Sequence, residues 1–243
     1  MTAAEKQMTA AEINNRFDFL YDNALSGQAP GINMYEKSMC LTQAYKEIIK
    51  EIAADSDKTE KRRVELSKLL VNTYINYDAA LNSTLTVIKT SPNSRIFELP
   101  EDCWYKQQER LYTSSTNSIR VTPKTRDEYN VQITNRFRKP STLEAWRLDL
   151  KDTISETEKQ IIEIISTTVP VKYFVSYIKR PKPVILESLA GTGYTIDGLT
   201  AITLPEVSDE LHEAIIKRAV LIAVETYKPQ DLEHKMVVTN REN

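Results

Sequence analysis

The feature that most constrains the fold of this chain is a proline-stiffened corner in its last third, Arg180-Pro181-Lys182-Pro183. An apolar run that begins at Val171 precedes the corner, and a short apolar run that ends at Leu186 follows it. Each proline fixes its own φ and pushes the residue before it toward extended geometry. The pattern therefore predicts a strand that leaves its sheet or runs at the sheet edge, a rigid basic corner, and a second short strand.

Residues 208–227 are predicted to form one amphipathic helix. Ser208 is the expected N-cap, and Asp209 and Glu210 occupy the first turn, where the helix dipole favours carboxylates. Two adjacent apolar stripes run along this helix, one made of Leu211, Ile215, Ala219 and Ile222 and the other of Ile216, Val220, Ala223 and Tyr227. So broad an apolar arc is typical of a central core helix, or of a helix shared between its own fold and a neighbouring subunit.

Composition indicates a soluble globular protein with a substantial core, because 41% of the 243 residues are hydrophobic. The 32 basic and 34 acidic residues leave a formal net charge of −2, which argues against a general nucleic-acid binder. Cys40 and Cys103 lack CxxC spacing, so neither a disulfide framework nor a zinc site is predicted, and a reducing cytoplasm is expected. The N-terminus has no apolar signal region, and no run is long enough to span a bilayer.

Helical signals come first along the chain. Thr9 with Glu12, and Asn33 with Glu36, form two capping-box patterns, each followed by apolar residues at helical spacing. The first helix is expected over residues 10–24, and the second begins after Asn33. A weaker pattern predicts a third helix over residues 58–74.

From Ile96 onward the pattern changes to short strands and turns. Strands are predicted at residues 96–99, 104–113 and 118–122, a short helix at 125–134, and a hairpin in which residues 159–166 pair with 171–178. Gly191, Gly193 and Gly198 mark turns before the last helix. The predicted fold class is α+β. Its parts are a helical part (1–95), a β-rich part built as a sheet or small barrel (96–207), a C-terminal helix packed on the helical part (208–227), and an extended tail (228–243).

Catalytic motifs are absent from the sequence. Gly191-Thr192-Gly193 does not continue into GxGxxG, and no P-loop, HExxH or GxSxG occurs. His212 has Ile216 where a second metal-binding histidine would be needed, so we interpret it as a structural or interface residue. His234 lies in the polar tail. We predict no catalytic residues, no cofactor and no metal.

Two pairs of neighbouring carboxylates are also interpreted as structural. Glu101 and Asp102 are adjacent in sequence, as are Asp209 and Glu210. Adjacent positions do not place two carboxylates on opposite sides of a substrate, as hydrolysis of a glycoside requires. The four are predicted to be turn and cap residues.

Two basic clusters carry the remaining functional signal. The first contains Arg136, Arg138 and Lys139, and the second contains Lys172, Lys179, Arg180 and Lys182. Three aromatic residues that we expect to be exposed, Phe137, Trp146 and Tyr177, accompany them. Such clusters can be ordinary solvated surface, or they can anchor a protein interface, since arginine and aromatic residues are enriched at binding hot spots. The expected interface residues are Arg136, Phe137, Arg138, Lys139, Trp146, Tyr177, Arg180, Lys182, Leu211, Ile215, Ile216, Ile222 and Tyr227.

An ordered set of short motifs between Ile13 and Tyr227 carries a family resemblance. The set comprises Phe17-Asp18-x-Leu20-Tyr21, Gln28-Ala29-Pro30-Gly31 with Tyr35-Glu36-Lys37-Ser38, Leu99-Pro100 with Trp104-Tyr105, Phe137-Arg138-Lys139-Pro140 with Ala145-Trp146-Arg147-Leu148, Tyr177-Ile178-x-Arg180-Pro181-x-Pro183 with Ile185-Leu186, and Ile196-Asp197-Gly198. In these motifs the chain resembles the head-to-tail connector, or adaptor ring, proteins of short-tailed phages, most closely those of crAss-like phages.

The resemblance implies a virion structural protein of the neck and tail that is assembled in the cytoplasm of the host bacterium. Such a protein would form a ring of about twelve copies, dock beneath the portal protein, extend the DNA channel and attach other neck or tail ring proteins. Genomic DNA would pass through without sequence specificity. In similar adaptors the helical part forms the ring wall, the β part projects outward, and the C-terminal tail contacts the portal.

Two alternatives to an adaptor remain open at the level of the sequence. One is a different ring of the neck or tail stack, such as a tail hub or nozzle component. The other is a nucleic-acid-binding module that uses the two basic clusters. An enzyme would require a site assembled wholly in space from residues that form no motif.

Overall fold

The computed structural model describes residues 8–25, 30–54, 64–79, 81, 89–91, 94–113, 117–135, 137–151 and 160–227. The chain has the predicted α+β class and divides into two compact units. Unit 1 combines Met1–Leu69 with Pro181–Asn243, and unit 2 is Leu70–Arg180. The predicted tail, residues 228–243, lies outside the described residues.

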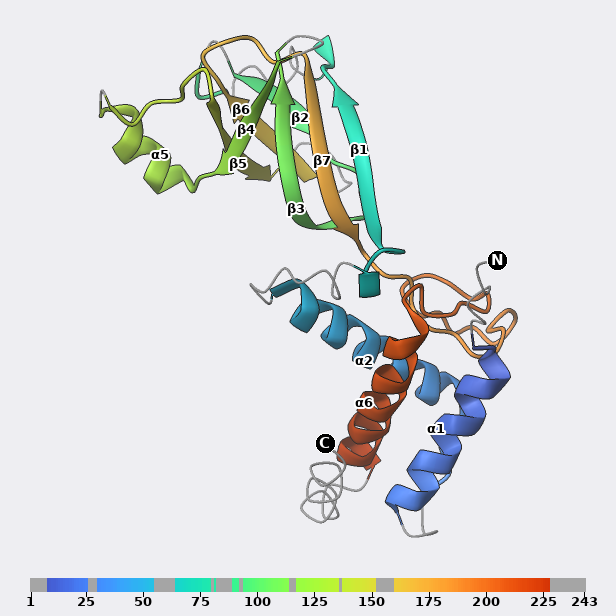
Figure 1. The fold of residues 1–243 in the computed structure, drawn as a ribbon. Helices are drawn as coiled ribbons and strands as arrows, with labels where there is room; N and C mark the ends of the chain where they lie inside the picture. Colours follow the sequence, from blue (N-terminus) through green and yellow to red (C-terminus); the bar gives the residue numbers. More distant parts are fainter. Residues whose placement is uncertain are drawn as a thin grey trace, which may run out of the picture. The chain divides into compact units, whose positions relative to one another are not determined.

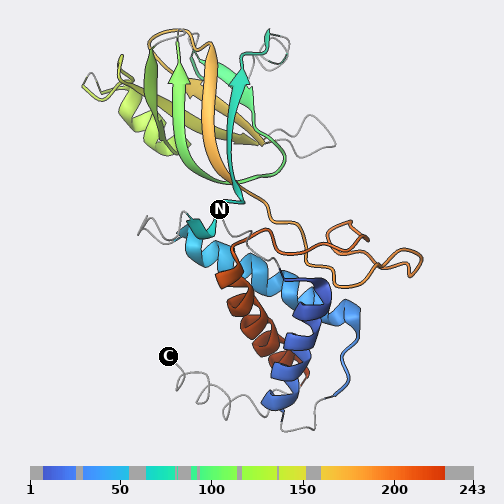
Figure 2. The ribbon, with the colours of Figure 1, turned by 45° about the vertical axis from the view of Figure 1, so that its right-hand side comes forward.

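Unit 1 is built around three helices, α1 (Ala10–Ala24), α2 (Met34–Ala54) and α6 (Asp209–Tyr227), shown in Figures 1 and 2. α6 packs against both α1 and α2. The side chains of Phe17, Leu41 and Ile215, one from each helix, are almost fully buried. The C-terminal helix therefore packs on the N-terminal helices, as the sequence predicts.

Both predicted capping boxes are present in unit 1. The Glu12 backbone N–H donates to Thr9 Oγ1 at 3.2 Å, and the Thr9 N–H donates to the Glu12 carboxylate at 2.8 Å. The same reciprocal pair links Asn33 and Glu36 at 2.8 and 2.9 Å. These bonds satisfy N–H groups that the helix itself cannot pair. Ser208 lies directly before α6, but its hydroxyl makes no hydrogen bond in the described part of the chain.

The segment between the proline corner and α6 belongs to unit 1. The Thr42 hydroxyl bonds both the N–H and the carbonyl of Val184, and the Leu186 N–H donates to Ser38 Oγ at 3.1 Å. The Thr42 and Ser38 side chains of α2 thus supply the hydrogen bonds that a neighbouring strand would otherwise make to this backbone. The predicted second short strand is reduced to a single bridge between Ile185 and Thr203.

The turns of this segment fall where the glycines predict them. Gly191, Gly193 and Gly198 all have positive φ, between 78° and 84°. This left-handed region is unfavourable for residues that carry a Cβ atom. The prediction of turns at these glycines is confirmed.

Unit 2 is a curled, seven-stranded sheet in the described residues, ordered β1-β7-β3-β4-β5-β6-β2. Its strands are β1 (Leu70–Asn76), β2 (Arg95–Glu98), β3 (Cys103–Tyr112), β4 (Ser118–Pro123), β5 (Glu144–Lys151), β6 (Gln160–Ile165) and β7 (Lys172–Lys179). β4 and β5 run parallel, and the short helix α5 (Arg126–Ile133) lies in the connection between them. The parallel pair requires such a crossover, because a tight turn can join only antiparallel strands.

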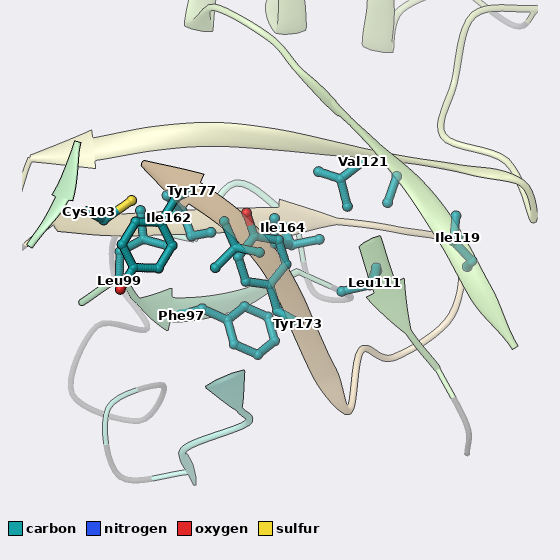
Figure 3. Close-up of a cluster of buried hydrophobic side chains, with 12 residues drawn as sticks. Phe97, Leu99, Cys103, Leu111, Ile119, Val121, Ile162, Ile164, Tyr173 and Tyr177 are labelled. Carbon is teal, nitrogen blue, oxygen red and sulfur yellow. The ribbon is translucent and has the colours of Figure 1, made fainter. Parts of the chain in front are cut away.

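The core of unit 2 lies inside the curl of the sheet (Figure 3). Every strand contributes to it: Val71 and Ile75 from β1, Phe97 from β2, Cys103 and Leu111 from β3, Ile119 and Val121 from β4, Ala145 from β5, Ile162 and Ile164 from β6, and Tyr173, Val175 and Tyr177 from β7. Phe97 and Tyr173 pack with ring centroids 5.6 Å apart. The concave face therefore holds the larger hydrophobic cluster of this unit.

The helix predicted over residues 58–74 is wrong from Leu70 onward, although residues 64–65 are helical. Residues 58–63 lie outside the described residues, and Leu70–Asn76 is strand β1, paired antiparallel with β7. Burial alternates along this strand, with Val71 and Ile75 facing the core and Asn72 exposed. A run of valine, threonine, tyrosine and isoleucine with period two fits a half-buried strand better than a helix.

The predicted hairpin between residues 159–166 and 171–178 is also wrong. β6 lies between β5 and β2, whereas β7 lies between β1 and β3. Both are buried central strands, and each finds its two partners elsewhere in the chain. Of the two geometries predicted for the proline corner, the structure has the one in which the strand leaves its sheet. β7 is a central strand and not an edge strand, and it ends at Lys179, just before the corner.

The observed division of the chain differs from the expected boundaries at residues 95 and 207. The sheet begins at Leu70 because β1 pairs with β7. Pro181–Val207 lies with the helices because α2 supplies its hydrogen-bond partners. Each difference results from a contact between residues that are far apart in sequence.

Candidate assembly surfaces

The predicted interface residues of α6 are mostly buried inside unit 1. Leu211, Ile215 and Ile216 are at most 9% exposed, so α1 and α2 already cover both apolar stripes over the first half of the helix. Ile222 and Tyr227 are half-buried. The C-terminal end of α6 therefore keeps part of its apolar surface exposed.

The α5 arm, defined as α5 and the described residues that follow it up to Leu143, is the most exposed apolar part of unit 2 among the residues that the structure describes. Val131, Phe137 and Leu143 are 72%, 92% and 79% exposed. Arg138 and Lys139 are exposed beside them, and Arg136 lies outside the described residues. Exposed apolar side chains of this size are typical of binding surfaces when they form one patch.

The α5 arm is held rigidly to the sheet at its base. Thr125 and Glu128 form a further capping box at the start of α5. Tyr129 packs edge-on against Trp146, with ring centroids 6.2 Å apart. The Phe137 N–H donates to Asn135 Oδ1 at 3.0 Å, which fixes the turn that presents Phe137. Figure 1 shows α5 beside the ends of β4 and β5.

Trp146 and Tyr177 are not the exposed aromatic residues that the sequence analysis expected. They are 3% and 2% exposed. Trp146 anchors the α5 arm, and the Tyr177 hydroxyl donates to Asp102 at 2.8 Å. Burial, followed by this hydrogen bond, raises the pKa of Tyr177. Trp146 is buried against Tyr129 of α5, whereas Tyr177 belongs to the hydrophobic cluster inside the curl of the sheet.

Lys172 lies apart from Lys179 and Arg180 of the second basic cluster. Lys172 and Lys179 are at opposite ends of β7, about 23 Å apart at roughly 3.3 Å per residue. Lys172 lies over the Tyr74 ring, 4.2 Å from its centroid. Lys182 is exposed and pairs with Glu206 at 3.7 Å.

Arg180 is the remaining member of this cluster. It is exposed, and its backbone N–H donates to the Asp102 carbonyl at 2.6 Å. This bond fixes the backbone at the end of β7 and leaves the guanidinium at the surface of unit 2. Arg180 is therefore exposed, as predicted, and it follows Lys179 directly in the chain.

The titratable residues considered as catalytic candidates have structural positions. His212 is 1% exposed, with Nε2 3.4 Å from the Pro205 carbonyl oxygen and Nδ1 3.8 Å from Asp209. Burial lowers the pKa of His212, so the ring is neutral near pH 7. Glu101 and Asp102 form the turn before β3, and Asp209 and Glu210 form the first turn of α6, as predicted.

Neither cysteine forms a reactive site. Cys40 and Cys103 are free and buried, and burial raises the pKa of the Cys103 thiol to about 11. Among the described residues, no three His, Cys, Asp or Glu side chains gather where they could hold a metal ion. The helices in that part of the chain also include none with the length and apolar content to cross a bilayer.

A buried ionic network between β3, β5 and β7 was not foreseen from the sequence. Arg147 pairs with Glu109, the Tyr173 hydroxyl donates to the same carboxylate at 2.5 Å, and Arg147 Nη2 lies 3.0 Å from Asp149. Burial, with the nearby Glu109 charge, raises the pKa of Tyr173. The three central side chains come from positions 109, 147 and 173, so no local motif indicates them.

Comparison with known proteins identifies the family. Residues 8–235 match the family model described as phage tail ring protein 3/4. The chain belongs to this family. It is 29% identical to Ring protein 4/5 of Bacteroides phage crAss001 over 231 residues, 91% of this chain and 94% of that protein. Ring protein 3 of the same phage is also 29% identical, over 230 residues that cover 89% of this chain and 95% of the relative.

Membership of the tail ring family agrees with the resemblance to crAss-like phage ring proteins. It makes the chain a structural component of the virion tail and not an enzyme. The match extends across both units, so the helices and the curled sheet belong to the same family architecture. The more specific role of a head-to-tail connector goes beyond the family description.

Proposed function

We propose that this protein is a head-to-tail adaptor that forms a closed ring of identical copies, about twelve in number. The ring would lie beneath the portal, continue the DNA channel and carry the next proteins of the tail. The observation that carries the proposal is the match of nearly the whole chain to a tail ring family and to two ring proteins of one phage.

Surface properties of the chain support an assembly role. The α5 arm presents exposed apolar and basic side chains on a rigid base, the composition typical of interface hot spots. The half-buried end of α6 offers a second apolar surface on unit 1. Two different surfaces on one molecule are what a head-to-tail contact requires, and such contacts give rings when the rotation closes.

A second position in the virion is favoured by the names of the relatives. They are called Ring protein 3 and Ring protein 4/5, which implies several rings in one stack. On this alternative the protein forms a ring further along the neck or tail and contacts other rings instead of the portal. The formal net charge of −2 suits either position, since dense phosphate pairing would hold DNA that must slide.

Negative-stain imaging distinguishes the two positions. The purified protein is imaged alone, with the portal ring of its phage, and with the other ring proteins. We expect rings that cap the portal, because an adaptor must recognise it. Rings that join only other ring proteins would favour the second position. Failure to form rings in every mixture would contradict the proposed function.

Phe137 tests the α5 arm as an assembly surface. Phe137→Ser is expected to leave the thermal midpoint of unfolding unchanged, because the side chain is 92% exposed and contributes little to the core. It should weaken docking of the ring to its neighbour by about tenfold or more, as loss of an aromatic hot spot does. Val169→Ser, which removes a 48% exposed side chain elsewhere in unit 2, is the control. If the Phe137→Ser variant docks as tightly as the wild type, the α5 arm is not part of the interface.

A further inference from the structure

Within the described residues, one edge of β3 has no strand partner from Tyr105 to Glu109. β3 pairs with β7 from Cys103 to Tyr112, with register shifts at Trp104 and Gln107, but it pairs with β4 only at Arg110–Tyr112. No strand in the described part of the chain pairs with the other edge between Tyr105 and Glu109. The Gln160 amide, which donates to the Cys103 carbonyl at 3.1 Å, covers one end. An open strand edge offers main-chain groups to another extended chain.

A groove of about 830 Å³ lies between β3 and β4 along this edge. Trp104 and Tyr105, whose ring centroids are 4.8 Å apart, line its β3 side. Lys106 and Glu109 also line it from β3, and Arg147 lines it from β5. This volume suits a short extended peptide.

Two positive charges that line the groove lie opposite each other and lower the stability of the free protein. Arg110 and Arg120 lie directly opposite each other in the β3–β4 pairing, and both line the groove. Like charges directly opposite across an antiparallel pair destabilise a sheet. Neither arginine forms an ion pair with any residue that the structure describes. An anion between them would turn this repulsion into two favourable contacts.

Arg147 provides an independent indication of a missing acceptor. Its side chain is 8% exposed, and two of its nitrogens bind Glu109 and Asp149. Its Nε atom is buried and makes no hydrogen bond within the described residues. A buried donor without an acceptor is unfavourable, so an acceptor from a bound chain would stabilise it.

We propose that the groove between β3 and β4 binds an extended acidic segment of a neighbouring protein in the ring stack. The main chain of the segment adds to the open edge of β3, and its carboxylates lie against Arg110 and Arg120. The identity of the neighbour rests on the proposed function. An open strand edge favours a peptide over nucleic acid, because main-chain N–H and C=O groups pair with another strand and phosphates match only the donors.

The test is fluorescence anisotropy with a labelled short peptide in which glutamate alternates with threonine and valine. A peptide with glutamine in place of glutamate is the neutral control. The purified protein should bind the acidic peptide at least about tenfold more tightly than the neutral one, with a strong dependence on salt. Equal binding of the two peptides would overturn the proposal.

Arg120→Gln separates a binding role from a structural one. It should reduce binding of the acidic peptide by about tenfold, while the thermal midpoint stays equal or rises, because the repulsion with Arg110 is removed. Arg126→Gln, an exposed arginine of α5 outside the groove, should change neither. A lowered midpoint together with unchanged peptide affinity would show a purely structural arginine and overturn the proposal.

Two further measurements test peptide binding by the groove and the proposed ring function separately. Binding of a labelled DNA duplex that depends on Arg120, without binding of the acidic peptide, would assign the groove to nucleic acid and overturn the proposal. Ring formation by wild-type protein is imaged in parallel. If rings form but the peptide does not bind, the proposed binding role of the groove is refuted and the ring function is not. If the peptide binds but no mixture forms rings, the ring function is refuted and the binding role is not.

Discussion

Ile215→Asp is expected to unfold the helical unit. Ile215 is 1% exposed on the face of α6 that packs against α1 and α2. An aspartate there would either bury an unpaired charge or force the helices apart. We expect a loss of at least about 4 kcal/mol in the free energy of unfolding, at the upper end of single-substitution effects. Urea denaturation followed by circular dichroism measures it, and rings should not form.

The matched control is Ile222→Asp, two turns further along the same helix. Ile222 is half-buried, so the new carboxylate can reach water. Its effect on the free energy of unfolding should be much smaller, about 1 kcal/mol. If Ile222→Asp folds normally but forms no rings, the end of α6 is an intersubunit contact. Similar stability of the Ile215→Asp variant and the wild type would contradict the packing of α6.

Arg147→Met is expected to destabilise unit 2 by about 3–5 kcal/mol, because it removes one partner of a buried ion pair. The Glu109 carboxylate, whose side chain is 7% exposed, would keep the Tyr173 hydroxyl as a partner but lose its counter-charge. The double variant Glu109→Leu with Arg147→Met should recover most of the lost stability, since no buried charge then remains unpaired. Thermal and urea unfolding of the single and double variants measure the coupling.

Lys106→Met is the control for this network. Lys106 pairs with Asp149 at 3.1 Å, but the Asp149 side chain is 60% exposed. A pair of this kind contributes at most about 1 kcal/mol. If Arg147→Met costs no more than Lys106→Met, the network is not a buried ion pair in solution. If the double variant is less stable than either single variant, Glu109 and Arg147 stabilise the unit independently of each other.

Signals that depend on a few neighbouring residues predicted much of the fold. α1 matches its prediction at both ends, and the pairs Thr9–Glu12 and Asn33–Glu36 form the capping boxes expected of them. The short strands β2 to β4 and the helix α5 lie within one or two residues of their predicted bounds. Capping, turn geometry and side-chain periodicity act within about one helical turn, so the sequence displays them directly.

The candidate surfaces were only partly predictable. Phe137, Arg138 and Lys139 were expected to be exposed, and they are. Trp146 and Tyr177 were expected beside them, and instead they are buried. An aromatic residue in an amphipathic strand looks the same from the sequence whichever face is covered, because a one-residue change in register moves every side chain to the other face.

The sequence by itself determined the helices α1, α2, α5 and α6, the glycine turns, the α+β class and the absence of catalytic motifs. Only the tertiary structure decided that Leu70–Asn76 joins the sheet, that β6 and β7 separate, and that Arg110 meets Arg120 at an open strand edge. The first two depend on pairing between residues tens of positions apart, and the third on where β4 stops following β3. Such pairing is chosen by the burial of the whole sheet, and no single segment carries enough information to specify it.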